Sequence, residues 1–339
     1  MILKNVPILA YHSHGSVSNS KLKTFRDVGP YYFKKKYIDK TVHDKPTEAL
    51  IFGGAFDAYL TEPDKYAECY TVKPETYTNE KGEENPWHGG SNTCKAWLAA
   101  NQDKQILDGD WPHTFEKMKE SLLEHPIIGA IISHPDTQAQ VTLRHQSKAF
   151  GIEMQTRPDW INLKGITGVD MGEPIFDGMD DEGMPKWKNP ADAFAKPFIA
   201  DLKTTNDFSD WFDWCQPTSD RAIRSVLKYS YHRQAALAQH VAIQDPEIGK
   251  VEQFLIVIEK SEPFRCGVFQ ISDAVLDEGF LSIERDLTRL KRCMETNEWP
   301  NSPDGVITIN RTQWLKDQAD RERDAFEDEQ RISEMAVLA

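Results

Sequence analysis

The sequence predicts an α/β protein in which a central mixed sheet is flanked by helices. Segments typical of helices fill most of the first 135 residues, but from Thr137 apolar and polar residues alternate as in half-buried strands. An apolar strand follows at 198–202, and after it come a long helical segment and two more strands. This order of elements is typical of an α/β sandwich.

The N-terminal part is expected to be helical. Ser18-Asn19-Ser20 is a plausible helix cap before a basic and aromatic segment at 21–37. Residues 49–60 form an apolar run, expected to be a buried helix with close backbone approach at Gly53-Gly54. A loop is expected at 74–92, and helices at 93–132, separated by prolines.

The remaining elements form the predicted core. Strands are expected at 137–143, 150–154, 159–163 and 198–202; then a helix at 219–243, strands at 251–259 and 265–271, and a helix at 273–298. We predict one domain over 1–310, with a helical part at 1–135, a catalytic core at 136–310 and an insertion at about 165–197. A charged helical tail is predicted at 311–339.

Composition limits the class of protein. The 339 residues are 39% hydrophobic and 28% charged, ordinary values for a soluble globular chain. No apolar run reaches the ~20 residues of a membrane helix, and the N-terminus lacks a signal-peptide pattern. The five cysteines are scattered without a Cys-x-x-Cys pair, so we expect reduced thiols. The sequence thus predicts a cytoplasmic protein without a membrane partner.

The formal net charge of −14 argues against non-specific nucleic-acid binding over the whole surface. A local basic lining can still bind nucleic acid. Basic residues do cluster, and each cluster is either such a lining or a solvated helix face. The clusters are Lys21, Lys23 and Arg26; Lys34, Lys35 and Lys36; and Arg221, Arg224, Lys228 and Arg233.

Two short stretches carry the chemistry: Arg157-Pro158-Asp159-Trp160 and Asp201-Leu202-Lys203-Thr204-Thr205. Asp201 and Lys203 are two positions apart on a predicted strand, so their side chains lie on one face. With Asp159 and the carbonyl of Leu202 they could bind Mg²⁺, which prefers oxygen ligands. The alternative is an exposed strand-end pair and a turn aspartate.

Considered together, four stretches resemble the PD-(D/E)xK nuclease superfamily, and more narrowly the RecE-type exonucleases (exodeoxyribonuclease VIII-like, with phage relatives). The resemblance spans residues 18 to about 270 and rests on the order of the stretches. They are Ser18-Asn19-Ser20 with Leu22 and Phe25, then Gly53-Gly54-Ala55-Phe56-Asp57, then the two stretches above counted together as the catalytic core, and finally Tyr231-His232-x-Gln234. It implies a restriction-endonuclease-like core.

The resemblance implies catalytic roles for Lys203, Asp201, Asp159 and Gln234. It also implies metal ligation by Asp159 and Asp201. Asp57 stands where the family has a histidine ligand and is expected to replace it, unless it is an ordinary helix aspartate. Gln140 stands where relatives often have an acidic residue, and no role is assigned to it. The 42 positions between Asp159 and Asp201 exceed the short family hairpin, hence the predicted insertion.

DNA contacts are expected from six residues. Ser18 and Ser20, with Lys23 or Arg26, could bind a 5′ phosphate; helix capping is the alternative for the serines. Arg157 could meet a phosphate or form a structural salt bridge. Tyr231 shares a helix face with Gln234, or is a core tyrosine.

The implied function is a Mg²⁺-dependent exodeoxyribonuclease, with Mn²⁺ expected to substitute and two ions per site. The resemblance implies 5′-to-3′ digestion of linear duplex DNA, with 3′ overhangs passed to a single-strand annealing protein. It also implies a homo-oligomeric ring, a trimer or tetramer, in the cytoplasm of a bacterial or phage-infected cell. The alternatives are an endonuclease on the same scaffold and an inactive DNA- or protein-binding phage module.

Overall fold

A computed structural model describes residues 1–302 except 80, 170, 173, 174, 180, 181, 183, 216 and 217, and beyond them only 305–308, 310, 316, 318 and 323. The chain divides into two compact units, Met1–Trp299 and Pro300–Ala339. Most of the tail predicted at 311–339 lies outside the described residues. Among the described helices, none has the length and apolar character needed to cross a membrane.

A five-stranded mixed sheet forms the centre of the first unit, with strand order β14-β13-β12-β9-β6. β12 pairs in parallel with β13 and antiparallel with β9, and the other pairs are antiparallel. This arrangement confirms the predicted mixed sheet. The strands are β6 (Thr137–Ala139), β9 (Trp160–Asn162), β12 (Phe198–Thr205), β13 (Glu252–Glu259) and β14 (Cys266–Ile271).

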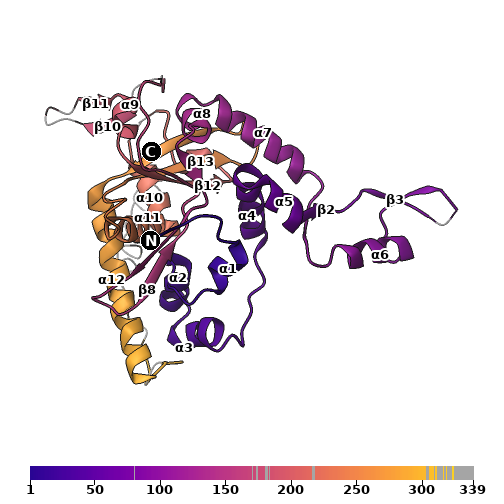
Figure 1. Cartoon of the computed structure of the whole chain (residues 1–339), viewed down its shortest axis with the longest axis horizontal. Helices are drawn as coiled ribbons and strands as arrows, with labels where there is room; N and C mark the ends of the chain where they lie inside the picture. Colours follow the sequence, from indigo (N-terminus) through magenta and orange to yellow (C-terminus); the bar gives the residue numbers. More distant parts are fainter. Residues whose placement is uncertain are drawn as a thin grey trace, which may run out of the picture. The chain divides into compact units, whose positions relative to one another are not determined.

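Helices cover both faces of this sheet (Figure 1). Apolar side chains of β12 and β13 alternate between the two layers, as the two-residue period of a strand requires. Ile199, Leu255 and Val257 pack in one core cluster, and Ala200 and Ile256 in the other. The first cluster includes residues of α2 (Asn19–Asp27), α11 (Tyr231–Ile243) and α12 (Asp273–Thr296); the second, of α4 (Glu48–Thr61), α7 (Trp111–Glu124) and α8 (Pro126–Ser133).

Sequence signals explain several helix starts. The hydroxyls of Ser18 and Thr47 accept backbone N–H groups at the starts of α2 and α4. Pro112 and Pro126 lie in the first turns of α7 and α8, where proline is favoured. The shorter helices are α1 (Ile8–Ser13), α3 (Pro30–Phe33), the π-helix η1 (Lys34–Ile38), α5 (Pro63–Cys69), α6 (Asn92–Ala100), α9 (Pro190–Phe194), the 3₁₀ helix η2 (Phe208–Asp210) and α10 (Asp220–Tyr229).

Smaller sheets lie outside the central one. β1 (Ile2–Leu3), β7 (Thr142–Gln146) and β8 (Glu153–Thr156) form a three-stranded sheet. β10 (Ile175–Met179) pairs with β11 (Pro185–Lys188), so the predicted irregular insertion contains a hairpin as well as α9. The other pairs are β2 (Tyr70–Val72) with β5 (Gln105–Leu107), and β3 (Thr76–Thr78) with β4 (Glu84–Pro86).

Two predictions for the N-terminal half were wrong in detail. The expected loop at 74–92 contains the β3–β4 hairpin, because Asn79 accepts two backbone N–H groups and Gly82 adopts a positive φ. The expected run of helices at 93–132 contains β5, which pairs in parallel with β2. A three-residue strand is too short for its period to be recognised.

Two predicted core elements are broken by left-handed residues. The strand predicted over 137–143 divides at Gln140, with φ 54°, into β6 and β7, which belong to different sheets. The helix predicted over 219–243 divides at Ser230, with φ 62°, into α10 and α11. The strand predicted at 150–154 lies at 153–156, after a turn in which Gly151 has a positive φ. A positive φ angle does not change the hydrophobic periodicity of the sequence, so these breaks could not be predicted from it.

An ion pair between Arg233 on α11 and Asp286 on α12 is buried, with the side chains 0% and 5% exposed. The Ser282 hydroxyl accepts a further bond from Arg233. We expect Asp286→Ala to destabilise the fold by roughly 3–5 kcal/mol, because the Arg233 charge is left unpaired. The double variant Arg233→Met/Asp286→Leu should recover much of this loss. Urea unfolding measures both, and equal losses in the two variants would contradict the assignment.

Candidate active site

Asp201 and Lys203 lie side by side on β12. Asp201 is 4% exposed, and the Lys203 Nζ lies 4.0 Å from its Oδ2. Both belong to the strand face of Ile199, which packs in the cluster containing α11. From that helix, Gln234 Nε2 donates to Asp201 Oδ2 at 2.7 Å. The two-residue spacing in the sequence therefore places an acid and an amine together, as predicted.

Asp159 joins this pair from the neighbouring strand. β9 pairs with β12 only as far as Trp160 opposite Ala200, so Asp159 lies directly beyond the last paired residue. Its Oδ2 accepts the Leu202 N–H at 2.6 Å, and its own N–H donates to Asp201 Oδ1 at 3.3 Å. The Asp159 carboxyl thus accepts the Leu202 N–H, which the backbone of β9 would otherwise accept. Pairing of β9 with β12 brings Asp159 and Asp201 together, although they are 42 positions apart in the sequence.

Gln140 links Asp159 to Asp57. Its Nε2 donates to both carboxylate oxygens of Asp57 at 2.9 Å and to Asp159 Oδ1 at 3.1 Å. Its backbone N–H also donates to the Asp159 carbonyl at 3.1 Å. Asp57 comes from α4, on the sheet face opposite α11. A single amide group therefore holds two acids that approach the site from different elements.

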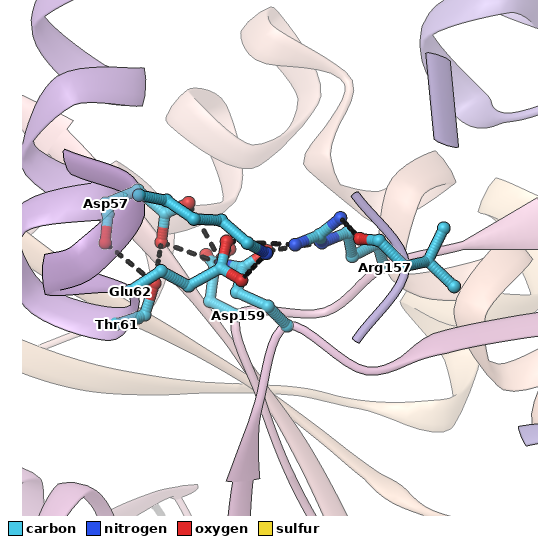
Figure 2. Close-up of polar contacts among 8 residues, drawn as sticks. Asp57, Thr61, Glu62, Arg157 and Asp159 are labelled. Atoms are coloured by element: carbon cyan, nitrogen blue, oxygen red, sulfur yellow. Dashed lines mark hydrogen bonds and ion pairs between the residues drawn. The ribbon is translucent and has the colours of Figure 1, made fainter. Parts of the chain in front are cut away.

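Arg157 supports this arrangement from the side, with Asp57 at the opposite end of the group (Figure 2). Its side chain is 4% exposed, and each guanidinium nitrogen has a partner: Nε donates to Gln140 Oε1 at 2.7 Å, Nη1 to the Val6 carbonyl at 2.8 Å, and Nη2 to Glu62 at 2.9 Å. Of the two roles considered for Arg157, the structure displays the salt bridge. The arginine fixes Gln140 and balances the acid of Glu62.

Tyr231 and Lys203 form a cation–π contact, with the Nζ 5.0 Å from the ring centroid. Tyr231 is partly buried and also packs against the core cluster that contains α11. It is therefore both a core tyrosine and a neighbour of the lysine. Gln234 lies one turn further along α11 and contacts Asp201.

Burial and like charge govern the ionisation of these acids. Burial, the charge of Asp159 and the charge of Glu62 raise the pKa of Asp57 well above its usual range. Burial and the charge of Asp201 raise the pKa of Asp159 to about 6. Burial lowers the pKa of Lys203, but the negative charges of Asp201 and Asp159 have the larger combined effect, so the pKa is raised. The lysine is therefore cationic at neutral pH.

The acids suit a divalent cation, although they do not form a compact cluster. No group of three or more His, Cys, Asp or Glu side chains arranged to hold a metal occurs among the described residues. Instead, Gln140 lies between Asp57 and Asp159, and Asp201 is bonded to Gln234. Burial first, and the neighbouring carboxylates second, raise the pKa of Asp57 and of Asp159, and a bound cation would favour the charged form of both acids.

The four residues predicted to bind a 5′ phosphate lie on α2 or at its N-cap. Ser18 caps α2 and its hydroxyl lies 2.9 Å from that of Ser20. Arg26 donates to Asp27 and, at 3.2 Å, to the Ser230 hydroxyl. Lys23 is exposed. Among the described residues, these four make no hydrogen bond or ion pair with Asp159, Asp201 or Lys203, so a phosphate pocket here stays a prediction.

Two participants were missed in the sequence. Gln140 received no role, since an amide in place of an expected acid gives no sign of bridging two others. Glu62, the partner of Arg157, directly follows α4, and no role was predicted for it from the sequence. Glu62 lies five residues after Asp57, a spacing that does not place two side chains on the same helix face, so the sequence gives no sign that they share a site.

Three comparisons set this geometry beside known proteins. Residues 178–312 match a family model described as a PDDEXK-like domain of unknown function (DUF3799). A solved structure from Eubacterium rectale, provisionally described as an exonuclease, is 16% identical, with a TM-score of 0.46 over 91% of this chain and 95% of that one. Curated proteins yield no match.

The family match, with the mixed sheet and its flanking helices, confirms the predicted PD-(D/E)xK-like fold class. The matched stretch contains Asp201, Lys203 and Gln234. Asp57, Gln140 and Asp159 lie outside it, so their place in the site rests on the contacts described above. The match supports the nuclease superfamily and does not extend to the narrower RecE type.

The Asp159 pKa predicts a pH dependence of stability in metal-free protein. A value of about 6 in the fold exceeds ~3.9 in the unfolded chain, so the folded state binds more protons in between. Stability should therefore fall as pH rises from about 4 to about 6. Urea unfolding in EDTA should show this fall, flattened in Asp159→Asn. Exposed Asp277→Asn is the control; the same slope in Asp159→Asn and wild type would contradict the assignment.

Removing the Gln140 amide should destabilise the metal-free protein, because Asp57 and Asp159 share this hydrogen-bond donor. We expect Gln140→Leu to lower the metal-free unfolding free energy at pH 7 by roughly 1–3 kcal/mol, because buried acceptors lose their donor. Mn²⁺ should restore more stability to this variant than to wild type. Thermal unfolding with and without Mn²⁺ measures both effects. An equal Mn²⁺ response in the two proteins would refute the bridging role.

Proposed function

We propose that this protein is a metal-dependent DNA exonuclease. The observation that carries the proposal is the junction of β9 and β12, where Asp159, Asp201 and Lys203 are tied together by the Leu202 N–H and the 4.0 Å acid–amine contact. Two acids and a cationic amine at one point suit hydrolysis of a phosphodiester. The PDDEXK-like match over residues 178–312 supports nuclease chemistry.

Asp57, Asp159, Asp201 and the Leu202 carbonyl would hold the metal. In a strand the N–H and C=O of one residue point to the same edge, so the Leu202 carbonyl faces the edge on which Asp159 accepts the Leu202 N–H. When bound, the metal would lower the pKa of a water and neutralise phosphate charge. We propose Mg²⁺, two ions per site, with Mn²⁺ as a substitute.

Lys203 is assigned to charge stabilisation. Because its pKa is raised, the amine is protonated at neutral pH and cannot accept a proton from water. It can orient the attacking water or donate to the developing negative charge on the phosphoryl group. Gln234 holds Asp201, and Tyr231 holds the lysine from the ring side. These two residues position the acid and the amine.

The finer features of the proposal come from the resemblance. They are 5′-to-3′ digestion of linear duplex DNA, 3′ overhangs for a strand-annealing protein, and a ring-shaped homo-oligomer. Ser18, Ser20, Lys23 and Arg26 would form the 5′-phosphate pocket. The second candidate is an endonuclease on the same scaffold, which would also cut closed or nicked circles.

End-labelled linear duplexes with 5′-phosphate or 5′-hydroxyl ends test this function directly. With Mg²⁺ we expect loss of the 5′ label first, faster from the phosphorylated end, and no attack on covalently closed circles. Cleavage of the circles at a similar rate would favour the endonuclease. Intact linear DNA together with no Mn²⁺ binding by calorimetry would falsify the enzyme assignment.

Two substitutions separate the roles within the site. Lys203→Ala should lower the hydrolysis rate by roughly 10²- to 10³-fold, the loss expected for a donor to transition-state charge, and leave Mn²⁺ binding intact. Asp201→Ala should remove both. Calorimetry and a duplex digestion assay measure the two properties. Full hydrolysis by Lys203→Ala would refute its assignment.

A further inference from the structure

The exposed residues of α10, together with Trp214 from the segment that precedes this helix, include both cations and aromatic rings. Ala222, Ser225 and Val226 form the buried face of this helix. Tyr229 is 44% exposed and Trp214 72%. We call this the α10 surface, made of Trp214, Arg221, Arg224, Leu227, Lys228 and Tyr229.

The α10 surface is continuous with the candidate active site. Ser230 adopts a left-handed conformation between α10 and α11, and Tyr229 and Tyr231 on either side of it stack with centroids 5.5 Å apart. The Tyr231 ring lies 5.0 Å from the Lys203 Nζ. At the other end, the Lys228 Nζ lies 5.1 Å from the Tyr229 ring. Cation and aromatic contacts therefore lead from Lys203 to the exposed surface.

The charges of this surface are partly free to bind an anion. Arg221 pairs with Asp213 at 2.6 Å. Arg224 and Lys228 are exposed, and no ion pair with any described residue is found for either. In a protein with a net charge of −14, two such cations beside the site form a local positive area that suits a phosphate backbone.

We propose that the α10 surface binds single-stranded DNA next to the catalytic site. Exposed rings stack on the faces of unpaired bases, whereas duplex DNA hides those faces within its own stack. Cations between the rings would contact the phosphates. The proposal rests on the proposed function for the identity of the strand, which would be the one being cut or its complement.

Binding can be measured without hydrolysis, using full-length protein in EDTA and fluorescein-labelled oligo(dT) of 15 nucleotides. We expect Tyr229→Ala to weaken binding roughly tenfold, because one base loses its stacking partner, and Tyr229→Phe to bind like wild type. Trp214→Ala should weaken binding similarly. A 15-base-pair duplex should bind more weakly and be indifferent to Tyr229→Ala.

Salt dependence tests the cations. For Arg224→Ala/Lys228→Ala, the slope of log affinity against log salt should decrease by about 1.4, since each single-strand phosphate contact contributes about 0.7. The control Arg285→Ala/Arg292→Ala removes the same charge from exposed positions of α12 and should leave the slope unchanged. Equal slopes in both double variants, or unchanged oligo(dT) affinity in Tyr229→Ala, would overturn the proposal.

The two proposals fail in different ways. If linear duplex is digested but the Tyr229 and Trp214 variants bind oligo(dT) like wild type, the α10 surface assignment is wrong and the enzyme remains. If linear duplex stays intact and Mn²⁺ does not bind, but oligo(dT) binding depends on Tyr229, the surface is a single-strand binding site and the enzyme assignment is wrong. If duplex binds as tightly as oligo(dT) and loses affinity equally in Tyr229→Ala, stacking on unpaired bases is excluded.

Discussion

The burial of three neighbouring carboxylates is the constraint on which the rest of this site depends. Asp57, Asp159 and Asp201 come from three elements and lie in a region of low exposure, where each charge raises the cost of the next. The surrounding residues offset that cost with hydrogen bonds and one positive charge. Gln140 donates to two of the acids, Gln234 to the third, and Lys203 supplies a positive charge.

The same constraint explains the use of amides rather than more cations. A second lysine or arginine at position 140 would neutralise the acids permanently and compete with a metal. An amide lowers their repulsion through hydrogen bonds but leaves the net charge negative, so the site keeps its attraction for a cation. Arg157 bonds to Gln140 and not to the three aspartates, and its charge is balanced by the ion pair with Glu62.

Much of the fold and part of the site follow from local sequence rules. The two-residue strand period places Asp201 beside Lys203, and the apolar run at 49–60 gives the helix that carries Asp57. The predicted ranges 251–259, 265–271 and 273–298 also agree closely with β13, β14 and α12, because long apolar or amphipathic segments have clear periods. The left-handed residues Gln140 and Ser230 could not be foreseen, since neither is glycine. Both redirect the chain at the site: one aims an amide between two acids, and the other turns α11 toward β12.

The site is assembled from parts of the chain that are synthesised far apart in time. Asp57 and Asp159 emerge from the ribosome well before β12, and the β12–β13 pair is complete only when residue 259 has been made. Until then Asp201 and Lys203 lack the parallel strand that holds β12 in the sheet, and the non-local pairing that forms it is slow. A nascent chain that ends before residue 259 therefore lacks the complete strand pairing that holds Asp201 and Lys203 beside Asp159.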